Sequence, residues 1–358
     1  MLQKERLERV FQALDDMRVE QMVISDPKSI WYLTGFYEFP FERFWALYIN
    51  KNGKHILAAN TLFSVPEDIG IDIMWHTDND NGASMLIPYI DQSKPLGIDK
   101  NLASRFLITF IDNNAALRYI NSSLAVDSVR AIKDKSEQEK MRKASLLNDK
   151  AITALKSHIH EGITEIELAD KLNLIYKEVG ADSVSFDPLV GFGANAALGH
   201  HAPDSTVLKE GDCILIDCGC KLEGYCSDMT WTYFFKNVSE KHKEVYNTVL
   251  KAQKYAESII KPGVKLCEID KAARDIISEA GYGKYFTHRL GHFIGTDEHE
   301  HGDVSGVNED TVKEGMVFSI EPGIYLPGDV GVRIEDLVLV TDNGVEILNH
   351  VDKELQVI

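Results

Sequence analysis

The chain has 358 residues, of which 44% are hydrophobic and 26% charged, and its formal net charge at pH 7 is −18. This length suits about two globular domains, and the acidic balance disfavours nucleic acid, whose phosphates need clustered Lys and Arg. No apolar run approaches the ~18 residues of a membrane helix, and five cysteines, an odd number, exclude a complete disulfide framework.

The N-terminal part of the chain alternates helical and strand patterns. A charged amphipathic helix is predicted over 2–17, and this segment is unlike a signal peptide. Apolar strands predicted over 43–49 and 54–59 flank Asn50-Lys-Asn-Gly53, which is a good hairpin signal. Further short strands are predicted at 21–25, 71–75, 96–98 and 124–126. The alternation predicts an α/β domain with a mixed sheet.

The pattern changes near residues 127–135. Ser136-Glu-Gln-Glu139 predicts a capping box at the start of a long helical segment that ends near Ile159. We therefore predict two domains, 1–127 and 128–358. Because no low-complexity sequence lies between them, we expect an ordered connection.

The cysteines are unevenly distributed, and four of them cluster at Cys213, Cys218, Cys220 and Cys226. No C-x-x-C spacing occurs, so the pattern of a zinc ribbon fails. We predict that these cysteines are small buried residues on strands. Unpaired cysteines and the absence of a secretion signal predict a cytoplasmic location.

The second domain carries an internal duplication. Val207–Gly219 reads VLKEGDCILIDCG and returns 104 positions later as TVKEGMVFSIEPG at Thr311–Gly323. Each copy runs from Lys-Glu-Gly through a short apolar strand to Ile-carboxylate-x-Gly, and the helical segments ahead of the copies align at an offset of 101. Neither half can bury a core alone, so we expect the halves to pack into one domain about a pseudo-twofold axis.

Each copy ends in an acid and is followed by a second strand with another acid. Asp217 and Asp228 form the first pair, and Glu321 and Glu335 form the second. Antiparallel strands joined by such a loop would point both carboxylates of a pair to the same side of a sheet. Four hard oxygen donors with a borderline nitrogen suit Mn, Co, Zn or Fe, and two such ions ~3.5–4 Å apart can activate a water. One such acid alone would be interpreted as a surface charge, but the duplication favours a two-metal centre.

Histidines cluster between the two acid pairs. Of the twelve in the chain, four lie in 288–301, and the pair His200-His201 lies upstream. Glycines on both sides of His292 would let the backbone approach a ligand closely. This arrangement predicts metal ligation or proton transfer, with His201 and His301 as bystanders.

Five motifs in chain order carry a family resemblance. They are Ile-Asp217-x-Gly, Ser-Asp228-Met-Thr, His288-x-x-Gly-His292-x-x-Gly-x-x-x-His299-Glu, Ile-Glu321-Pro-Gly and Gly-Val-Arg333-Ile-Glu335-Asp. As a set they resemble the pita-bread metallopeptidases, which include methionine aminopeptidase, aminopeptidase P and prolidase, with creatinase as a metal-free relative. Tyr32-Leu-Thr-Gly-Phe36 resembles the N-terminal domain that prolidase, aminopeptidase P and creatinase share. The resemblance implies an α/β N-terminal domain with a mixed sheet and an α+β pita-bread catalytic domain.

The resemblance also implies a role for each site residue. Two divalent ions per subunit, manganese first and cobalt or zinc as alternatives, would be held by Asp217, Asp228, His292, Glu321 and Glu335. Glu321 would also be the general base that deprotonates the metal-bound water. His299 would stabilise the oxyanion, and His200 would lie near the leaving group or the substrate amine. His288 and Arg333 would contact the ligands from behind or bind the substrate carboxylate.

The resemblance implies an Xaa-Pro peptidase and, as an expectation from the family, a homodimer. The charge and the short apolar runs predict neither nucleic acid nor a membrane as partner. The N-terminal domain disfavours methionine aminopeptidase, which lacks it. Arg289 adds a cation beside the site, which favours prolidase, a dipeptidase that binds the free carboxylate of proline. Aminopeptidase P, which acts on longer peptides, stays open. A binding module without activity and a metal-free hydrolase are disfavoured because all five ligands are present.

Overall fold

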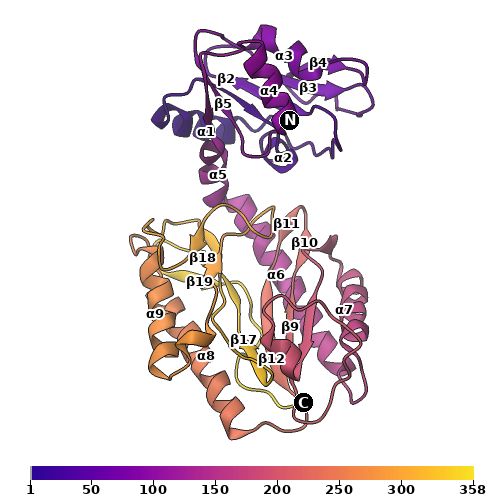
Figure 1. Cartoon of the computed structure of the whole chain (residues 1–358), viewed down its shortest axis with the longest axis vertical. Coiled ribbons are helices and arrows are strands. Elements are labelled where there is room, and N and C mark those ends of the chain that lie inside the picture. The colour runs from indigo at the N-terminus through magenta and orange to yellow at the C-terminus, as the bar shows by residue number, and fades with distance from the viewer. Residues whose placement is uncertain (1) are drawn as a thin grey trace. The chain divides into compact units, whose positions relative to one another are not determined.

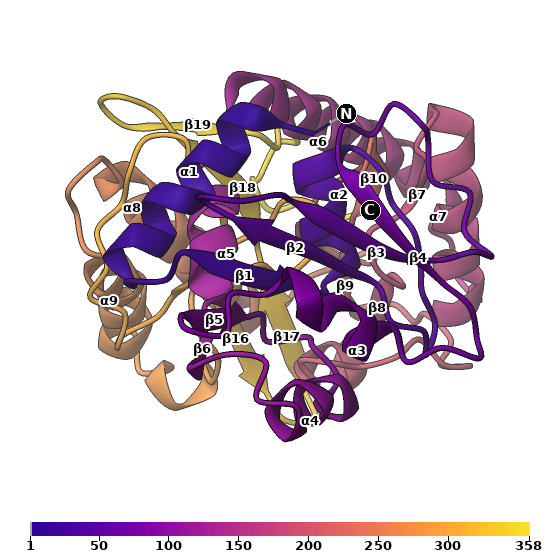
Figure 2. The same cartoon turned by 90° about the horizontal axis from the view of Figure 1, so that it is seen from above.

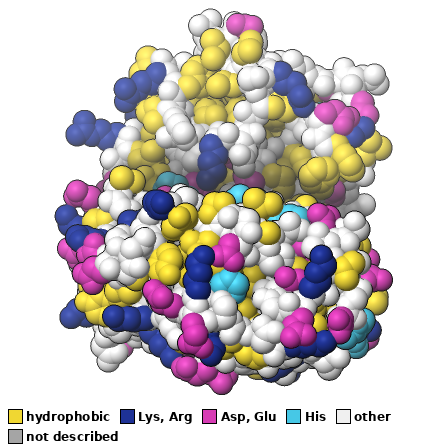
Figure 3. All heavy atoms as spheres, turned by 60° about the horizontal axis from the view of Figure 1, so that its bottom comes forward, with side chains coloured by type: hydrophobic (Ala, Val, Ile, Leu, Met, Phe, Trp, Pro, Cys, Tyr) yellow, Lys and Arg dark blue, Asp and Glu magenta, His cyan; other side chains and the backbone are white. Residues whose placement is uncertain are grey.

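Figure 1 shows the computed structural model, which describes residues 2–358. The chain divides into two compact units, Met1–Arg130 and Ala131–Ile358, and the division falls at the end of α5 (Ser123–Ala131). The boundary predicted between residues 127 and 128 lies in the same helix. No helix within residues 2–358 is long and apolar enough to cross a membrane. On the face seen in Figure 3, acidic and basic side chains are interspersed with apolar ones.

The first unit is built on a six-stranded mixed sheet with the strand order β4-β3-β2-β1-β5-β6, seen from above in Figure 2. Strand β2 pairs antiparallel with both β1 and β3, whereas the remaining neighbours are parallel. The β2–β3 pair confirms the predicted hairpin. The strands are β1 (Gln21–Ile24), β2 (Ala46–Asn50), β3 (Ile56–Asn60), β4 (Asp72–His76), β5 (Pro95–Ile98) and β6 (Arg118–Asn121).

Helices cover both faces of this sheet. Helices α1 (Lys4–Asp16), α2 (Pro27–Thr34) and α5 bury apolar residues against one face. Helices α3 (Gly82–Leu86) and α4 (Ser104–Asp112) do so on the other face, with the short 3-10 turn η1 (Ile87–Tyr89) between them. The sheet therefore separates two apolar cores, as an α/β layer fold requires.

The strand predicted at 124–126 is wrong. These residues lie in α5, and the strand at this point is β6, which ends just before the helix. Ala125 and Val126 are buried because they are part of the helical face that packs on the sheet. An apolar run of three residues has no periodicity that separates a strand from a buried helical turn.

The second unit repeats one order of elements twice. The first half contains α6 (Lys135–Leu155), α7 (Glu165–Val179), strand β9 (Cys213–Cys218), the ribbon β10–β11 (Cys220–Leu222 and Tyr225–Cys226) and strand β12 (Met229–Phe234). The second half contains α8 (Glu240–Ile259), α9 (Leu266–Glu279), strand β15 (Val317–Ile320), the ribbon β16–β17 (Gly323–Leu326 and Val330–Arg333) and strand β18 (Asp336–Val340). The predicted duplication is thus confirmed.

Each half contains its own three-stranded sheet. Strands β8 (Leu189–Phe192), β9 and β12 form one sheet, and β15, β18 and β19 (Val345–Ile347) form the other. In Figure 1 the pair α6 and α7 flanks the strands on one side, and α8 and α9 flank them on the other. The smaller elements are β7 (Ser183–Val184), β13 (Gly291–His292), β14 (Asp303–Val304), η2 (Lys156–His158), η3 (Gly193–Ala197) and η4 (Gly283–Tyr285).

The four clustered cysteines lie in strands β9, β10 and β11, and they are buried as predicted. Their burial in the apolar core raises the pKa of the Cys213 thiol to about 12 and that of the Cys220 thiol to about 11. These two thiols are therefore neutral, and they pack as small apolar side chains.

The capping box of α6 lies two residues earlier than predicted. The Asp134 carboxylate accepts a hydrogen bond from the Glu137 backbone N–H at 2.9 Å, and the Glu137 carboxylate accepts one from the Asp134 N–H at 2.8 Å. Asp and Ser are similarly good N-caps, and both are followed by Glu after three positions. The sequence pattern alone could therefore not choose between Asp134 and Ser136.

Candidate metal centre

The repeated strand pairs bring four carboxylates to one place. Asp217 lies on β9 opposite Thr230 of β12, and Asp228 immediately precedes β12. In the second half Glu321 follows β15, and Glu335 immediately precedes β18. Because each strand pair is antiparallel, the end of one strand lies beside the start of the other, so the two acids of each pair meet.

Two glycines allow the close strand approach that this arrangement needs. A Cβ atom on Gly219 would lie 2.0 Å from the carbonyl oxygen of Ser227, and one on Gly291 would lie 1.8 Å from that of Ser319. Any side chain at these positions would push the backbones apart. The glycines therefore keep the segments next to Asp217 and His292 in contact with their neighbours.

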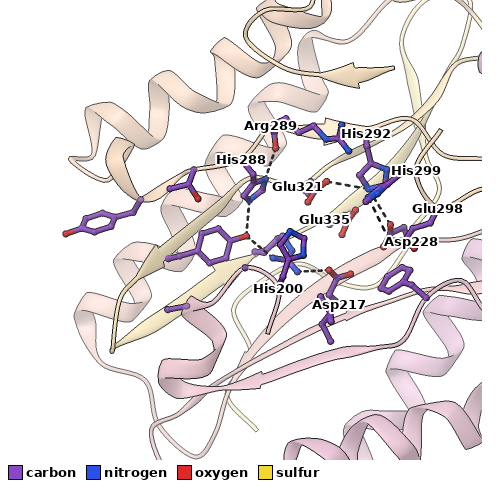
Figure 4. Close-up of a pocket in the computed structure, with 18 of the residues that line it drawn as sticks. His200, Asp217, Asp228, His288, Arg289, His292, Glu298, His299, Glu321 and Glu335 are labelled. Carbon is purple, nitrogen blue, oxygen red and sulfur yellow. Dashed lines mark hydrogen bonds and ion pairs between the residues drawn. The ribbon is translucent and has the colours of Figure 1, made fainter. Parts of the chain in front are cut away.

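His292 adds a nitrogen to the cluster. Its Nε2 lies 3.5 Å from Oδ2 of Asp228 and 3.5 Å from Oε1 of Glu321. Its Nδ1 faces the carbonyl oxygen of Phe293 at 3.3 Å, an arrangement that places the ring hydrogen on Nδ1 and turns the Nε2 lone pair toward the acids. Donor atoms of Asp228, His292 and Glu335, all buried, lie within 4.8 Å of one another, and Figure 4 shows these side chains converging.

The electrostatics of the cluster favour a bound cation. Burial, with the neighbouring Glu335 carboxylate, raises the pKa of Asp228 well above its ordinary value, and burial with Glu321 does the same to the pKa of Glu335. Burial raises the pKa of Glu321 to about 7 and lowers that of His292 to about 3. Among residues 2–358, no hydrogen-bond donor reaches the buried oxygens Oδ1 of Asp217, Oδ1 of Asp228 and Oε1 of Glu335. Buried acceptors of this kind require a partner, and hard divalent cations fit this donor set.

Arg333 holds two of the acids in position, Asp217 directly and Glu335 through Thr230. Its guanidinium is buried and donates to Oδ2 of Asp217 at 2.6 Å, to the Tyr325 hydroxyl at 2.8 Å and to Oγ1 of Thr230 at 2.9 Å. Thr230 in turn donates to Oε2 of Glu335 at 2.6 Å. One side chain therefore fixes the orientation of a carboxylate in each half of the duplication.

Tyr325 and Thr230 were not predicted from the sequence. Both lie in apolar strands and are buried, where a Tyr or Thr is normally part of the core. Their role is known only from their hydrogen bonds to Arg333 and Glu335, and no spacing in the sequence predicts it.

The remaining predicted residues line the same cavity, whose volume is about 730 Å³. The His288 ring is held between the Tyr325 hydroxyl, 2.9 Å from Nε2, and the Arg289 carbonyl, 2.7 Å from Nδ1. Burial lowers the pKa of His288 to about 4 and also lowers that of His299, whose ring lies 4.1 Å from the ring of His292. All predicted site residues thus meet in one place: His200, Asp217, Asp228, His288, His292, His299, Glu321, Arg333 and Glu335.

Comparison with protein families agrees with this geometry. Residues 139–342, more than half of the chain, match the model of metallopeptidase family M24, and residues 6–132 match the creatinase/prolidase N-terminal domain. The chain belongs to metallopeptidase family M24. The second unit is accordingly the pita-bread domain of this family, and the first is its creatinase-like companion.

Relatives match over nearly the whole chain. An uncharacterised peptidase of Staphylococcus aureus strain USA300 is 38% identical, covering 97% of this chain and 99% of its own length. The crystal structure of a prolidase from Thermococcus sibiricus superposes with a TM-score of 0.94 at 33% identity, covering 100% of both chains. An X-Pro aminopeptidase from Thermotoga maritima superposes with a TM-score of 0.83 at 30% identity, covering 97% of this chain and 100% of its own. This M24 peptidase is therefore similar both to a prolidase and to an aminopeptidase.

Proposed function

We propose that this peptidase is a prolidase that hydrolyses the Xaa-Pro bond of dipeptides with two divalent metal ions. The observation that carries the proposal is the buried acid–histidine cluster, in which three carboxylate oxygens have no donor among the described residues. The full-length similarity to a prolidase supports the choice of substrate. The proposal assigns Asp217, Asp228, His292, Glu321 and Glu335 as the metal ligands, with manganese as the expected metal and cobalt or zinc compatible with the same donors.

Bound ions of this kind supply Lewis-acid activation of a water and of the peptide carbonyl. Glu321 accepts the proton of the attacking water, and Ser319 steadies this carboxylate by donating to Oε1 at 3.1 Å. The water oxygen bonds to the carbonyl carbon, and the bond from that carbon to the proline nitrogen breaks. The proline nitrogen takes up a proton, so the products are a free amino acid and proline.

The histidines of the cavity act on the peptide itself. His299 donates to the oxygen that becomes negative in the transition state. His200 contacts the substrate amine or the proline nitrogen that leaves. The His288 ring is fixed on both nitrogens, and it orients the proline end of the substrate together with Tyr325.

Arg289 supports dipeptides as the substrate class. Its side chain is 40% exposed at the cavity, and its guanidinium lies 4.0 Å from the Asp303 carboxylate, at the limit of an ion pair. We therefore assign it the binding of the free carboxylate of a C-terminal proline. The second candidate, aminopeptidase P, is favoured by the similarity to the Thermotoga enzyme.

A comparison of Ala-Pro with Ala-Pro-Ala separates the two activities. We expect kcat/KM to favour Ala-Pro by about tenfold or more, as a charged hydrogen bond worth roughly 1.5–3 kcal/mol requires. The variant Arg289→Gln should lose that preference, whereas Lys209→Gln, outside the cavity, should keep it. Faster cleavage of Ala-Pro-Ala by the unmodified enzyme would instead identify an aminopeptidase.

The proposal also includes a homodimer and a cytoplasmic location. Light scattering coupled to size exclusion should give twice the mass of one chain, and the mass of a single chain would contradict the dimer. The location rests on the sequence alone, and it stays a prediction.

A further inference from the structure

One of the buried carboxylates outside the lining of the cavity lies beside a loop that enters it. Glu165, the first residue of α7, is completely inaccessible to solvent. Its Oε1 accepts hydrogen bonds from the Phe192 N–H at 2.7 Å and the Asn195 side-chain amide at 3.0 Å. Its Oε2 accepts from Nε2 of His201 at 2.6 Å and from the Asp204 N–H at 3.0 Å. Glu165 thus ties together a strand end, the turn η3 and the loop after it.

The geometry of this group distinguishes it from the metal centre. Donor atoms of Glu165, His201 and Asp204 lie within 4.8 Å of one another, which a cation site would also show. However, four N–H donors already fill the acceptor positions of the Glu165 carboxylate, and the His201 ring presents its N–H to that carboxylate. In the metal centre, by contrast, three buried carboxylate oxygens have no donor among residues 2–358. The Glu165 group is therefore a hydrogen-bonded anchor.

The anchored loop carries His200. Asn195 and His201, on either side of His200, are both bonded to Glu165, and His200 reaches into the cavity (Figure 4). The turn η3 also packs directly on the backbone of Gly331, where an added Cβ atom would lie 1.8 Å from the Ala196 carbonyl oxygen. Among the described residues, 2–358, none is seen to hydrogen-bond the exposed His200 side chain, so the position of His200 depends on its neighbours in the loop.

The other half of the unit holds its histidine loop in a similar way with different residues. The buried Asp270 of α9 accepts a hydrogen bond from the Leu290 N–H at 3.1 Å. Arg274, paired with Asp270, donates to the carbonyl oxygens of Phe286 at 3.0 Å and His288 at 2.9 Å. In both halves, a buried acid on the second helix therefore fixes the backbone that presents a histidine.

We infer that Glu165 and His201 are positioning residues, which hold the loop so that His200 meets the substrate. The inference rests on the proposed Xaa-Pro hydrolysis and deepens it. His201 is therefore no bystander, although it does not touch the cavity. Residues that hold a metal ligand or a substrate-binding side chain in position typically contribute about 10- to 100-fold to activity.

The test is a double-mutant cycle on the metal-loaded enzyme with Ala-Pro as substrate. We expect His201→Ala to lower kcat/KM about 10- to 100-fold and His201→Gln, which keeps an N–H in place of Nε2, to restore most of the loss. In a His200→Ala background, His201→Ala should cause no further loss, because its effect passes through His200. The control His350→Ala alters another histidine that faces an acid, Asp149, and should leave kcat/KM unchanged.

An activity-independent measurement accompanies the cycle. Hydrogen exchange of the segment 192–206 should be slow in the unmodified protein and faster in Glu165→Gln and in His201→Ala, with the content of bound metal unchanged. Full activity of His201→Ala, an additive loss in the His200→Ala background, or unchanged exchange would overturn the inference. A loss of bound metal in His201→Ala would also overturn it. If the unmodified enzyme cleaves no Xaa-Pro peptide, the proposed function fails, and unchanged exchange alone would then refute the anchor.

Discussion

Removal of the metal should leave a cluster of acids that destabilises the fold in a pH-dependent way. Glu321 is the clearest member, because burial raises its pKa from 4.5 to about 7 and Asp217 adds to the increase. The variant Glu321→Gln has nearly the same shape and no charge. In the metal-free state it should therefore be more stable than the unmodified protein wherever Glu321 would be ionised.

Proton linkage gives the direction in which the stability of the metal-free protein changes with pH. Between pH 4.5 and about 7 the folded protein keeps a proton on Glu321 that the unfolded chain has released. Stability falls with rising pH wherever the folded state binds more protons. This increase in the pKa of Glu321 corresponds to a loss of about 3 kcal/mol in the free energy of unfolding. Roughly 2–3 kcal/mol of that loss develops between about pH 5 and pH 8. The pKa values of His288 and His292 are lowered, which has the opposite sign, but both histidines are present in both proteins.

The assay is urea unfolding of both proteins in EDTA and in manganese at several pH values. In EDTA, the free energy of unfolding of Glu321→Gln minus that of the unmodified protein should rise by roughly 2–3 kcal/mol from about pH 5 to pH 8. In manganese the order should reverse, because the bound ions stabilise the ionised acid. A difference in EDTA that stays flat or falls with pH would refute the electrostatic account of the cluster.

Three further predictions test single contacts. Asp228→Asn should lower the bound manganese measured by mass spectrometry from two ions per chain to one or none, and an unchanged count would contradict its role as a ligand. Arg333→Lys should lower kcat/KM about 10- to 100-fold, because the ammonium cannot reproduce the fork that binds Asp217; full activity would contradict the ordering role of Arg333. Gly331→Ala, whose Cβ would meet the backbone of η3 at 1.8 Å, should cost about 1–3 kcal/mol or more in urea unfolding. Gly344→Ala, whose Cβ would meet no atom within 4 Å, is the control. An equal loss of stability in the two variants would contradict the close packing of Gly331 as the cause.

The sequence predicted the second unit well because its duplication is visible in the residues themselves. Two copies of the Ile-acid-x-Gly motif, each with a following acid, predict two strand pairs, and the structure contains β9–β12 and β15–β18. Strand pairing then determines where the acids lie, since side-chain direction alternates along a strand. The convergence of the four acids on one cavity could therefore be predicted before any contact was known.

Other features needed the structure. The run 124–126 is helical because its surroundings, and not its own pattern, decide its conformation. Tyr325 and Thr230 act through atoms brought together from distant strands. His201 was interpreted as a bystander since nothing in the sequence links it to Glu165, 36 positions earlier. Long-range hydrogen bonds of this kind leave no spacing that a single sequence reveals.

The most direct test of the account is a manganese titration of the EDTA-treated protein, with bound metal and proline release from Ala-Pro measured on the same samples. The account predicts no proline release without metal and full activity once two ions per chain are bound. Proline release in excess EDTA, full activity at one ion per chain, or no release at any occupancy would contradict it.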